Sequence, residues 1–207
     1  MKKELPGGVR LSENQSRKLA YVGEFKEAPF LSSGALRRFL RLSQKITLGD
    51  KKKKFVDGDL KIVLQDRSDT FVRYLKVTIG QDSYFVKESR TTFLGGGASE
   101  ILTSNELREI LEKEGFNYAE VVKFKLGYED RSGRTYYVAT WDERLTKGLD
   151  EWLADRSLTR QEREEINRRY RELRDKLSTK YGFTDVSALN MSYDPQTKKI
   201  IIFDANR

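Results

Sequence analysis

The sequence predicts an α+β fold in which a five-stranded antiparallel sheet with one helix precedes a smaller helical part ending in a β-hairpin. Three observations lead to this prediction. Segments rich in Val, Ile, Tyr and Phe alternate with turn formers between residues 60 and 140. A long charged helix with a narrow apolar stripe follows. The stretch 184–206, T-D-V-S-A-L-N-M-S-Y-D-P-Q-T-K-K-I-I-I-F-D-A-N, then reads as a hairpin flanked by oxygen-bearing side chains.

The composition is that of a globular protein, since 37% of the 207 residues are hydrophobic and 35% are charged. No apolar run approaches the roughly 20 residues that cross a bilayer. The N-terminal M-K-K-E-L-P-G-G lacks the apolar core of a signal peptide. We therefore expect no transmembrane segment and a cytoplasmic location.

The chain contains neither cysteine nor histidine. Disulfide scaffolds, zinc fingers, thiol nucleophiles, Ser-His-Asp triads and His-ligated metals are therefore excluded. An enzyme with this composition works with carboxylates, Lys, Arg, hydroxyls and oxygen-bound metal. Phosphoryl transfer fits, because it depends mainly on positioning and charge neutralisation.

Positive charge is concentrated at the N-terminus, where residues 1–54 contain 14 Lys and Arg against 5 Asp and Glu. A helix is expected over 33–45, with Leu36, Phe39 and Leu40 on one face, and a basic run follows it. This segment is either solvated surface or a site for an acidic partner or nucleic acid. The residues proposed for such contacts are Arg37, Arg38, Arg41, Lys51, Lys52, Lys53 and Lys54.

The five strands of the sheet are expected at 60–64, 71–79, 84–87, 119–127 and 135–140. The first three form an antiparallel meander, in which the turn G-Q-D-S at 80–83 joins the second strand to the third. A helix over 99–114, stopped by Gly115, separates the third strand from the fourth.

Two helices are expected after the sheet. Residues 141–154 form a short one, and the long one begins at Thr159, whose Thr-x-x-Glu pattern with Glu162 is a capping box. Gly182 ends the long helix. We therefore expect a basic N-terminal extension over 1–54, a sheet region over 55–140 and a reduced helical region over 141–207.

Asp185, Asn190 and Asp204 flank the C-terminal hairpin. Hard cations such as Mg²⁺ bind carboxylate and amide oxygens, so the hairpin is a candidate site for magnesium and a phosphate-bearing substrate. The alternative is that Asp185 is only a turn or cap residue. Asp194, followed by proline, is assigned to the hairpin turn.

With this order of elements, five residues make the sequence resemble the protein-kinase-like fold, which includes protein kinases and aminoglycoside-phosphotransferase-type enzymes. They are Lys87 in F-V-K-E on the third strand, Glu106 on the next helix, Asp185-x-x-x-x-Asn190, and Asp204 ending I-I-I-F-D. The resemblance covers residues 59–206.

The resemblance implies a Mg²⁺-dependent kinase that transfers the γ-phosphate of ATP to a hydroxyl of an unidentified protein or small molecule. Lys87 and Glu106 would serve the nucleotide phosphates, and Asn190 and Asp204 would bind Mg²⁺. Asp185 would orient or deprotonate the acceptor hydroxyl. Glu100 and Glu109, on the same helix, are alternatives to Glu106.

The sequence departs from the family's pattern at several places. Residues 65–70, Q-D-R-S-D-T, contain no glycine where a glycine-rich loop is usual. Phe183 and Thr184 stand where many relatives have His-Arg or His-Gly, and Ser187 stands where Ser/Thr kinases have lysine. The sequence ends three residues after Asp204, so we expect a truncated C-terminal lobe.

The alternatives to an active kinase are a catalytically weak pseudokinase and a basic regulatory module that binds nucleic acid or a partner. The acceptor and the oligomeric state stay open.

Overall fold

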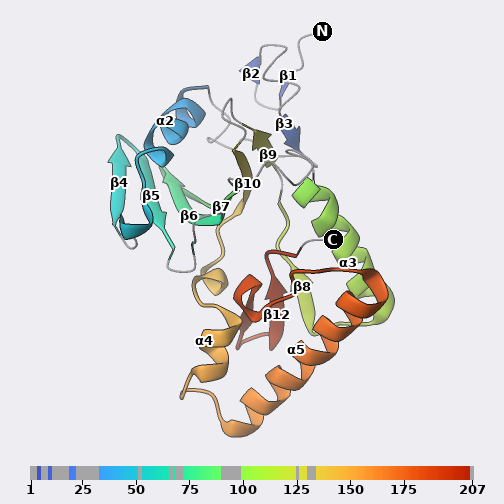
Figure 1. The fold of residues 1–207 in the computed structure, drawn as a ribbon. Helices are drawn as coiled ribbons and strands as arrows, with labels where there is room; N and C mark the ends of the chain where they lie inside the picture. Colours follow the sequence, from blue (N-terminus) through green and yellow to red (C-terminus); the bar gives the residue numbers. More distant parts are fainter. Residues whose placement is uncertain are drawn as a thin grey trace. The chain divides into compact units, whose positions relative to one another are not determined.

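The structure is a computed structural model, and it describes residues 4–5, 9–10, 19–21, 33–50, 53–65, 68, 72–89, 99–124, 126–129 and 134–205. The chain forms two compact units, shown in Figure 1. Unit 1 comprises Met1–Ile101 and Phe124–Trp141, and unit 2 comprises Leu102–Lys123 and Asp142–Arg207. The predicted α+β class is confirmed. Within the described part of the chain, no helix is long and apolar enough to cross a membrane.

Unit 1 is built on an antiparallel sheet whose strand order is β3-β9-β10-β7-β6-β5-β4. The predicted five strands are represented by its central part, β9-β10-β7-β6-β5, and β3 and β4 extend the two edges. The strands are β3 (Leu19–Tyr21), β4 (Lys54–Asp57), β5 (Leu60–Leu64), β6 (Val72–Ile79), β7 (Asp82–Ser89), β9 (Leu126–Glu129) and β10 (Thr135–Thr140). A separate pair is formed by β1 (Glu4–Leu5) and β2 (Val9–Arg10).

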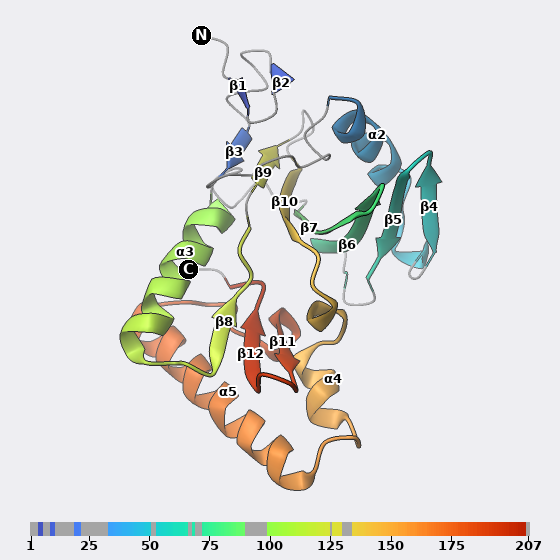
Figure 2. The same cartoon turned by 180° about the vertical axis from the view of Figure 1, so that it is seen from behind.

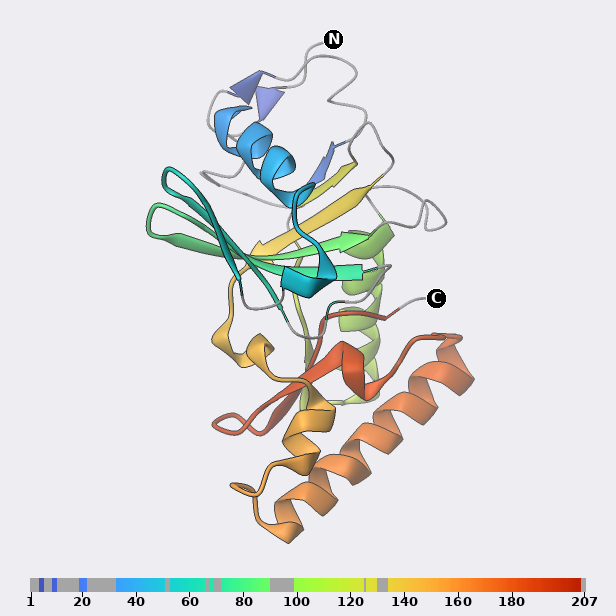
Figure 3. The same ribbon diagram turned by 60° about the vertical axis from the view of Figure 1, so that its left-hand side comes forward.

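The predicted N-terminal helix is present as α2 (Ser33–Ser43), followed by the short 3-10 helix η2 (Leu48–Asp50). It is not an appendage, because its apolar residues Leu36, Phe39 and Leu42 are buried in the core of unit 1. The Phe39 ring meets that of Tyr136 edge-on, with ring centroids 5.4 Å apart. Figure 3 shows α2 lying across one face of the sheet. The expected extension over residues 1–54 therefore includes core residues of unit 1.

A buried ion pair ties this helix to the sheet. Arg73 on β6 and Glu88 on β7 stand opposite each other in the ladder, and their side chains are fully buried and paired. The Arg73 guanidinium also donates to a carbonyl at the end of α2, Ser43 O at 3.0 Å, and to one just after it, Ile46 O at 2.7 Å. Arg73 thus satisfies backbone acceptors that the end of a helix leaves open.

Unit 2 contains a three-stranded sheet in the order β11-β12-β8, with β12 in the middle. Figure 2 shows these strands side by side. Strand β12 (Lys199–Ile202) pairs antiparallel with β11 (Met191–Asp194) and parallel with β8 (Ala119–Val121). The other elements are α3 (Ser99–Glu114), η3 (Glu143–Thr146), α4 (Leu149–Ala154), α5 (Arg160–Tyr181) and η4 (Ala188–Asn190).

The long helix α5 has the boundaries that its sequence predicts. Thr159 is the N-cap and accepts from the backbone N–H of Glu162, and the Glu162 carboxylate accepts from Thr159 N at 2.8 Å. Gly182 ends the helix with φ +74°, a left-handed conformation that favours glycine. The capping box and the C-terminal stop are therefore confirmed.

Two predicted elements were wrong. The single strand expected over 119–127 is two strands, β8 in unit 2 and β9 in unit 1, because β8 pairs with the distant strand β12 instead of the main sheet. The helix expected over 141–154 is broken into η3 and α4, because Lys147 is extended and Gly148 starts α4 as its N-cap. Strand β4 was missed, since its first residue, Lys54, was assigned to a charge run.

We expect Arg73→Met to lower the free energy of unfolding by about 3–5 kcal/mol, because Glu88 would stay buried without its main partner. Urea denaturation followed by circular dichroism measures this loss. Arg41→Met is the matched control, since Arg41 is 63% exposed and pairs with Asp57 at the surface. That variant should lose about 1 kcal/mol or less. Equal losses in the two variants would contradict the importance of the buried pair.

Candidate functional site

The segment that leads from α5 to η4 places Asp185. Its neighbours Phe183 and Val186 are buried in the core of unit 2, whereas Asp185 is half-buried. The left-handed turn at Gly182 redirects the chain, and Phe183 N donates to Leu177 O at 3.1 Å. Asp185 is thus held between two hydrophobic anchors.

Asn190 is hydrogen-bonded to the two other predicted site residues of the C-terminal region, Asp185 and Asp204. Its side-chain Nδ2 donates to the main-chain carbonyl of Asp185 at 3.2 Å. Its own main-chain carbonyl accepts from Phe203 N at 3.1 Å and from Asp204 N at 3.3 Å. The main chains of Asp185, before the β11–β12 hairpin, and Asp204, after it, therefore both contact Asn190.

Asn190 and Asp204 carry amide and carboxylate oxygens, the kinds of atom that Mg²⁺ binds. The hydrogen bond from Nδ2 leaves Asn190 Oδ1 as an oxygen to which no described residue donates. Asp204 is only 5% exposed, and Asn190 is 9% exposed. The described residues contain no group of three acidic side chains that could hold a metal ion by themselves. Mg²⁺ needs only one or two carboxylates when phosphates and water complete its coordination.

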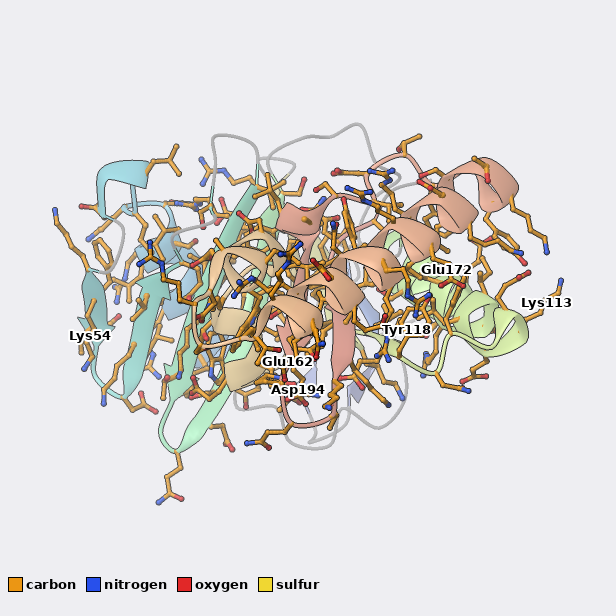
Figure 4. The ribbon with its side chains drawn as sticks, turned by 90° about the horizontal axis from the view of Figure 1, so that it is seen from below. Lys54, Lys113, Tyr118, Glu162, Glu172 and Asp194 are labelled. Atoms are coloured by element: carbon orange, nitrogen blue, oxygen red, sulfur yellow. The ribbon has the colours of Figure 1, made fainter. Side chains whose placement is uncertain are left out.

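The β11–β12 hairpin holds Asn190 and Asp204 at its two ends, and Asp194 fixes its turn. Asp194 accepts from Gln196 N at 2.9 Å, Thr197 Oγ1 at 2.6 Å and Arg144 at 3.1 Å. Burial tends to raise the pKa of Asp194, but these donors outweigh it and hold the pKa below its ordinary value. Asp194 is labelled in Figure 4. It serves the turn, as the sequence predicts.

Arg144 connects the hairpin to the neighbouring elements of unit 2. It forms ion pairs with Asp142 at 2.6 Å, Glu120 on β8 at 2.8 Å and Asp194 at 3.1 Å. The buried Ser192 hydroxyl lies within reach of two carbonyls of the same region, at Arg144 and, 2.6 Å away, at Lys147. Through Glu120 and Asp194, Arg144 therefore links β8 and β11, the two edge strands of the small sheet.

Glu106 lies on α3 and is half-buried, whereas Glu109 is exposed. The side chain of Glu100 lies outside the described side chains. Glu114 at the end of the same helix binds the end of α5, through Lys176 at 3.0 Å, Lys180 at 2.6 Å and the Tyr181 hydroxyl. The helix that bears Glu106 is therefore fastened to the helix that leads to Asp185.

The hydrogen bond from Lys180 is the largest of the effects that lower the pKa of Glu114 to about 2, followed by those from Tyr181 and Lys176. Since the pKa is lowered on folding, this stabilisation exists above pH 4.5 and is lost as the pH falls towards 2.

Lys87 lies in unit 1, on the central strand β7, and is 3% exposed. Its neighbours across the two adjacent ladders are Tyr74 and Tyr137. The Phe85 ring, two residues away on the same strand face, stacks on Tyr74 with centroids 5.8 Å apart. The surroundings of Lys87 on this face are therefore largely aromatic.

The connection between β5 and β6 is organised by Ser68. The Ser68 hydroxyl accepts from Tyr74 N at 2.9 Å and lies 3.2 Å from Tyr74 O, to which it donates. Gln65 N donates to the same carbonyl at 2.8 Å. In the segment 65–70, where the resemblance led us to expect a glycine-rich loop, residues 66, 67, 69 and 70 lie outside the described residues. Nothing in the sequence pattern indicated this role for Ser68.

Much of the charge predicted to contact a partner is paired within unit 1. Arg38 binds the carbonyl of Asp57 at 3.1 Å and the carboxylate of Asp59 at 2.7 Å, and Arg41 pairs with Asp57. Lys53 pairs with Asp50 at 2.9 Å. Arg37 is exposed, and Lys51 and Lys52 lie outside the described residues.

The structure thus brings Asp185, Asn190 and Asp204 together within unit 2, where Glu106 also lies, and it places Lys87 in unit 1. No family model matches the chain, and no curated protein matches its sequence.

We expect Glu114→Gln to lower the melting temperature most at neutral pH, because the charged carboxylate binds two lysines there. The difference from the unsubstituted protein should shrink as the pH falls from 4.5 towards 2. Thermal melts across this range measure the effect. Glu112→Gln, at an exposed position of the same helix, should leave the melting temperature nearly unchanged. A pH-independent difference for Glu114→Gln would contradict the assignment.

Proposed function

We propose that the chain is an atypical kinase that transfers the γ-phosphate of ATP, with Mg²⁺, to a hydroxyl of a protein or small-molecule acceptor. The observation that supports this most is the hydrogen bonding of Asn190. It connects Asn190 to the main chains of Asp185 and Asp204, two residues whose carboxylates are the kind of oxygen donor that Mg²⁺ and a phosphoryl-transfer site need.

In this proposal Asp204 and the Oδ1 atom of Asn190 hold the metal, and Asp185 positions the acceptor hydroxyl. Bound Mg²⁺ would neutralise charge on the nucleotide phosphates. Asp185 is suited to positioning because its main chain is fixed by Asn190 and its neighbours are anchored in the core. A carboxylate held in this way aligns a hydroxyl without a large conformational cost.

Lys87, in unit 1, would provide positive charge for the nucleotide phosphates, and Glu106, in unit 2, keeps the carboxylate role that the sequence resemblance implies. Lys87 is a buried lysine on a strand face lined by aromatic rings. The rings suit a flat nucleotide base, and the ammonium group suits the phosphates. Half-buried Glu106 fits the carboxylate role better than exposed Glu109.

A pseudokinase that binds nucleotide without transferring phosphate is the second candidate. The observation that favours it is the β5–β6 connection, where Ser68 is tied to Tyr74 and the sequence 65–70 has no glycine to bring backbone N–H groups close to phosphates.

The nucleotide site predicts stabilisation that requires ATP and Mg²⁺ together. At about 100 times the Kd, bound nucleotide should add about 2.7 kcal/mol to the free energy of unfolding. Differential scanning fluorimetry with ATP, Mg²⁺ and both measures this. Asp204→Asn should abolish the joint effect, whereas Asp175→Asn, on the exposed face of α5, should keep it. No joint shift in the unsubstituted protein would reject the site.

Transfer itself is tested with γ-labelled ATP, by following release of phosphate and labelling of the protein. Asp185→Asn should reduce turnover about 10²–10⁴-fold while keeping the thermal shift, because it removes the group that handles the acceptor proton. Joint ATP and Mg²⁺ stabilisation without any turnover would favour the pseudokinase. Turnover that persists in both Asp185→Asn and Asp204→Asn would overturn both assignments.

A further inference from the structure

The main sheet of unit 1 has two faces of different chemistry. Residues paired across an antiparallel ladder point to the same side of a sheet. Ile62, Leu75 and Val77 belong to the core that α2 covers. Their neighbours along β4, β5 and β6 therefore form the opposite side, which we call the open face. Its positions are Lys54, Val56, Lys61, Val63, Val72, Tyr74, Lys76 and Thr78.

The open face has positive charge and no negative charge among these eight positions. Lys54 and Lys61 are exposed, and neither forms an ion pair with a described residue. The acidic residue of β4, Asp57, lies on the α2 side, where Arg38 and Arg41 bind it. No acidic residue of β4, β5 or β6 therefore lies on the open face.

Three lysines on adjacent strands form a compact basic group. Lys54 pairs with Val63, which pairs with Lys76, so Lys54 and Lys76 lie in one row across three strands, about 10 Å apart. Lys61 lies on the middle strand, opposite Val56. The Lys76 ammonium lies 4.4 Å from the centre of the Trp141 ring. Figure 4 shows Lys54 on the outer strand.

The chemistry of this group suits phosphate better than carboxylate or lipid. Lysine binds as a point charge on a flexible stem, whereas carboxylates are recognised best by the fork of arginine, which the open face lacks. Membrane binding needs protruding apolar anchors, and Val56, at 54% exposed, is the one exposed large hydrophobic residue described in unit 1. The flexible lysine stems can each reach a different phosphate of one strand.

We propose that the exposed Lys54 and Lys61 bind the phosphate backbone of a single-stranded nucleic acid without base specificity, next to the half-buried Lys76. The proposal differs from the expected role of the helix α2 arginines, because Arg38 and Arg41 are engaged with Asp57 and Asp59. It does not depend on phosphoryl transfer. Binding of this kind is mainly electrostatic and weakens steeply with salt.

The test measures anisotropy of a fluorescein-labelled oligothymidylate with the full chain at several salt concentrations. The double variant Lys54→Gln with Lys61→Gln should bind about 10–100-fold more weakly at about 50 mM salt, and its log–log salt slope should be smaller by about 1.4. The matched control, Arg37→Gln with Lys45→Gln, removes one exposed charge from α2 and one from the turn after it, and should change affinity far less. Asp204→Asn should bind as the unsubstituted protein does.

Several results would overturn the proposal. These are no binding at the lowest salt, unchanged binding in the Lys54 and Lys61 variant, or an equal loss in the α2 control, which would show a net-charge effect. Competition by poly-L-glutamate as effective as by unlabelled oligothymidylate would instead indicate an acidic polypeptide partner. Tighter binding to phosphatidylserine vesicles would indicate a membrane surface.

Discussion

Arg73 and Glu88 are buried without access to water, and two opposite charges in that position must stay paired because an isolated charge there is very costly. The pair fixes β6 against β7, and the remaining donors of Arg73 fix the end of α2. Glu88 follows Lys87 directly, so strand alternation puts them on opposite faces. The same interaction that holds α2 on one face therefore sets the register that presents Lys87 on the other.

In unit 2, backbone hydrogen bonds at Asn190 hold the candidate site residues in place. Asn190 is both the last residue of η4 and the acceptor for the residues that follow β12. Substituting its side chain would remove only the bond to Asp185, because the bonds from Phe203 and Asp204 go to its main chain. The positions of Asn190 and Asp204 are thus determined by the hairpin, and Arg144 and Asp194 support it at its turn.

Local patterns in the sequence predicted the elements whose signals are local. The Thr159 capping box, the Gly182 stop and the strands at 60–64 and 135–140 all depend on neighbouring residues. The error over 119–127 came from long-range pairing, since nothing in that stretch shows that Ala119 will pair with Ile200. The structure places the main chains of Asp185 and Asp204 at Asn190, and the chemical roles predicted for these three residues stay predictions. The position of Lys61 beside β4 could not be predicted, because only the strand register shows it.

The central position of β12 has a consequence for the order of folding. Its neighbours β8 and β11 do not pair with each other, so the small sheet does not exist until residues 199–202 have been synthesised. Pairing of Ile200 with Ala119 closes a long loop, which is slow compared with the formation of α3 or α5. During translation, α3 and α5 will therefore expose apolar surface before unit 2 closes. Chaperone binding to nascent chains should concentrate in that interval.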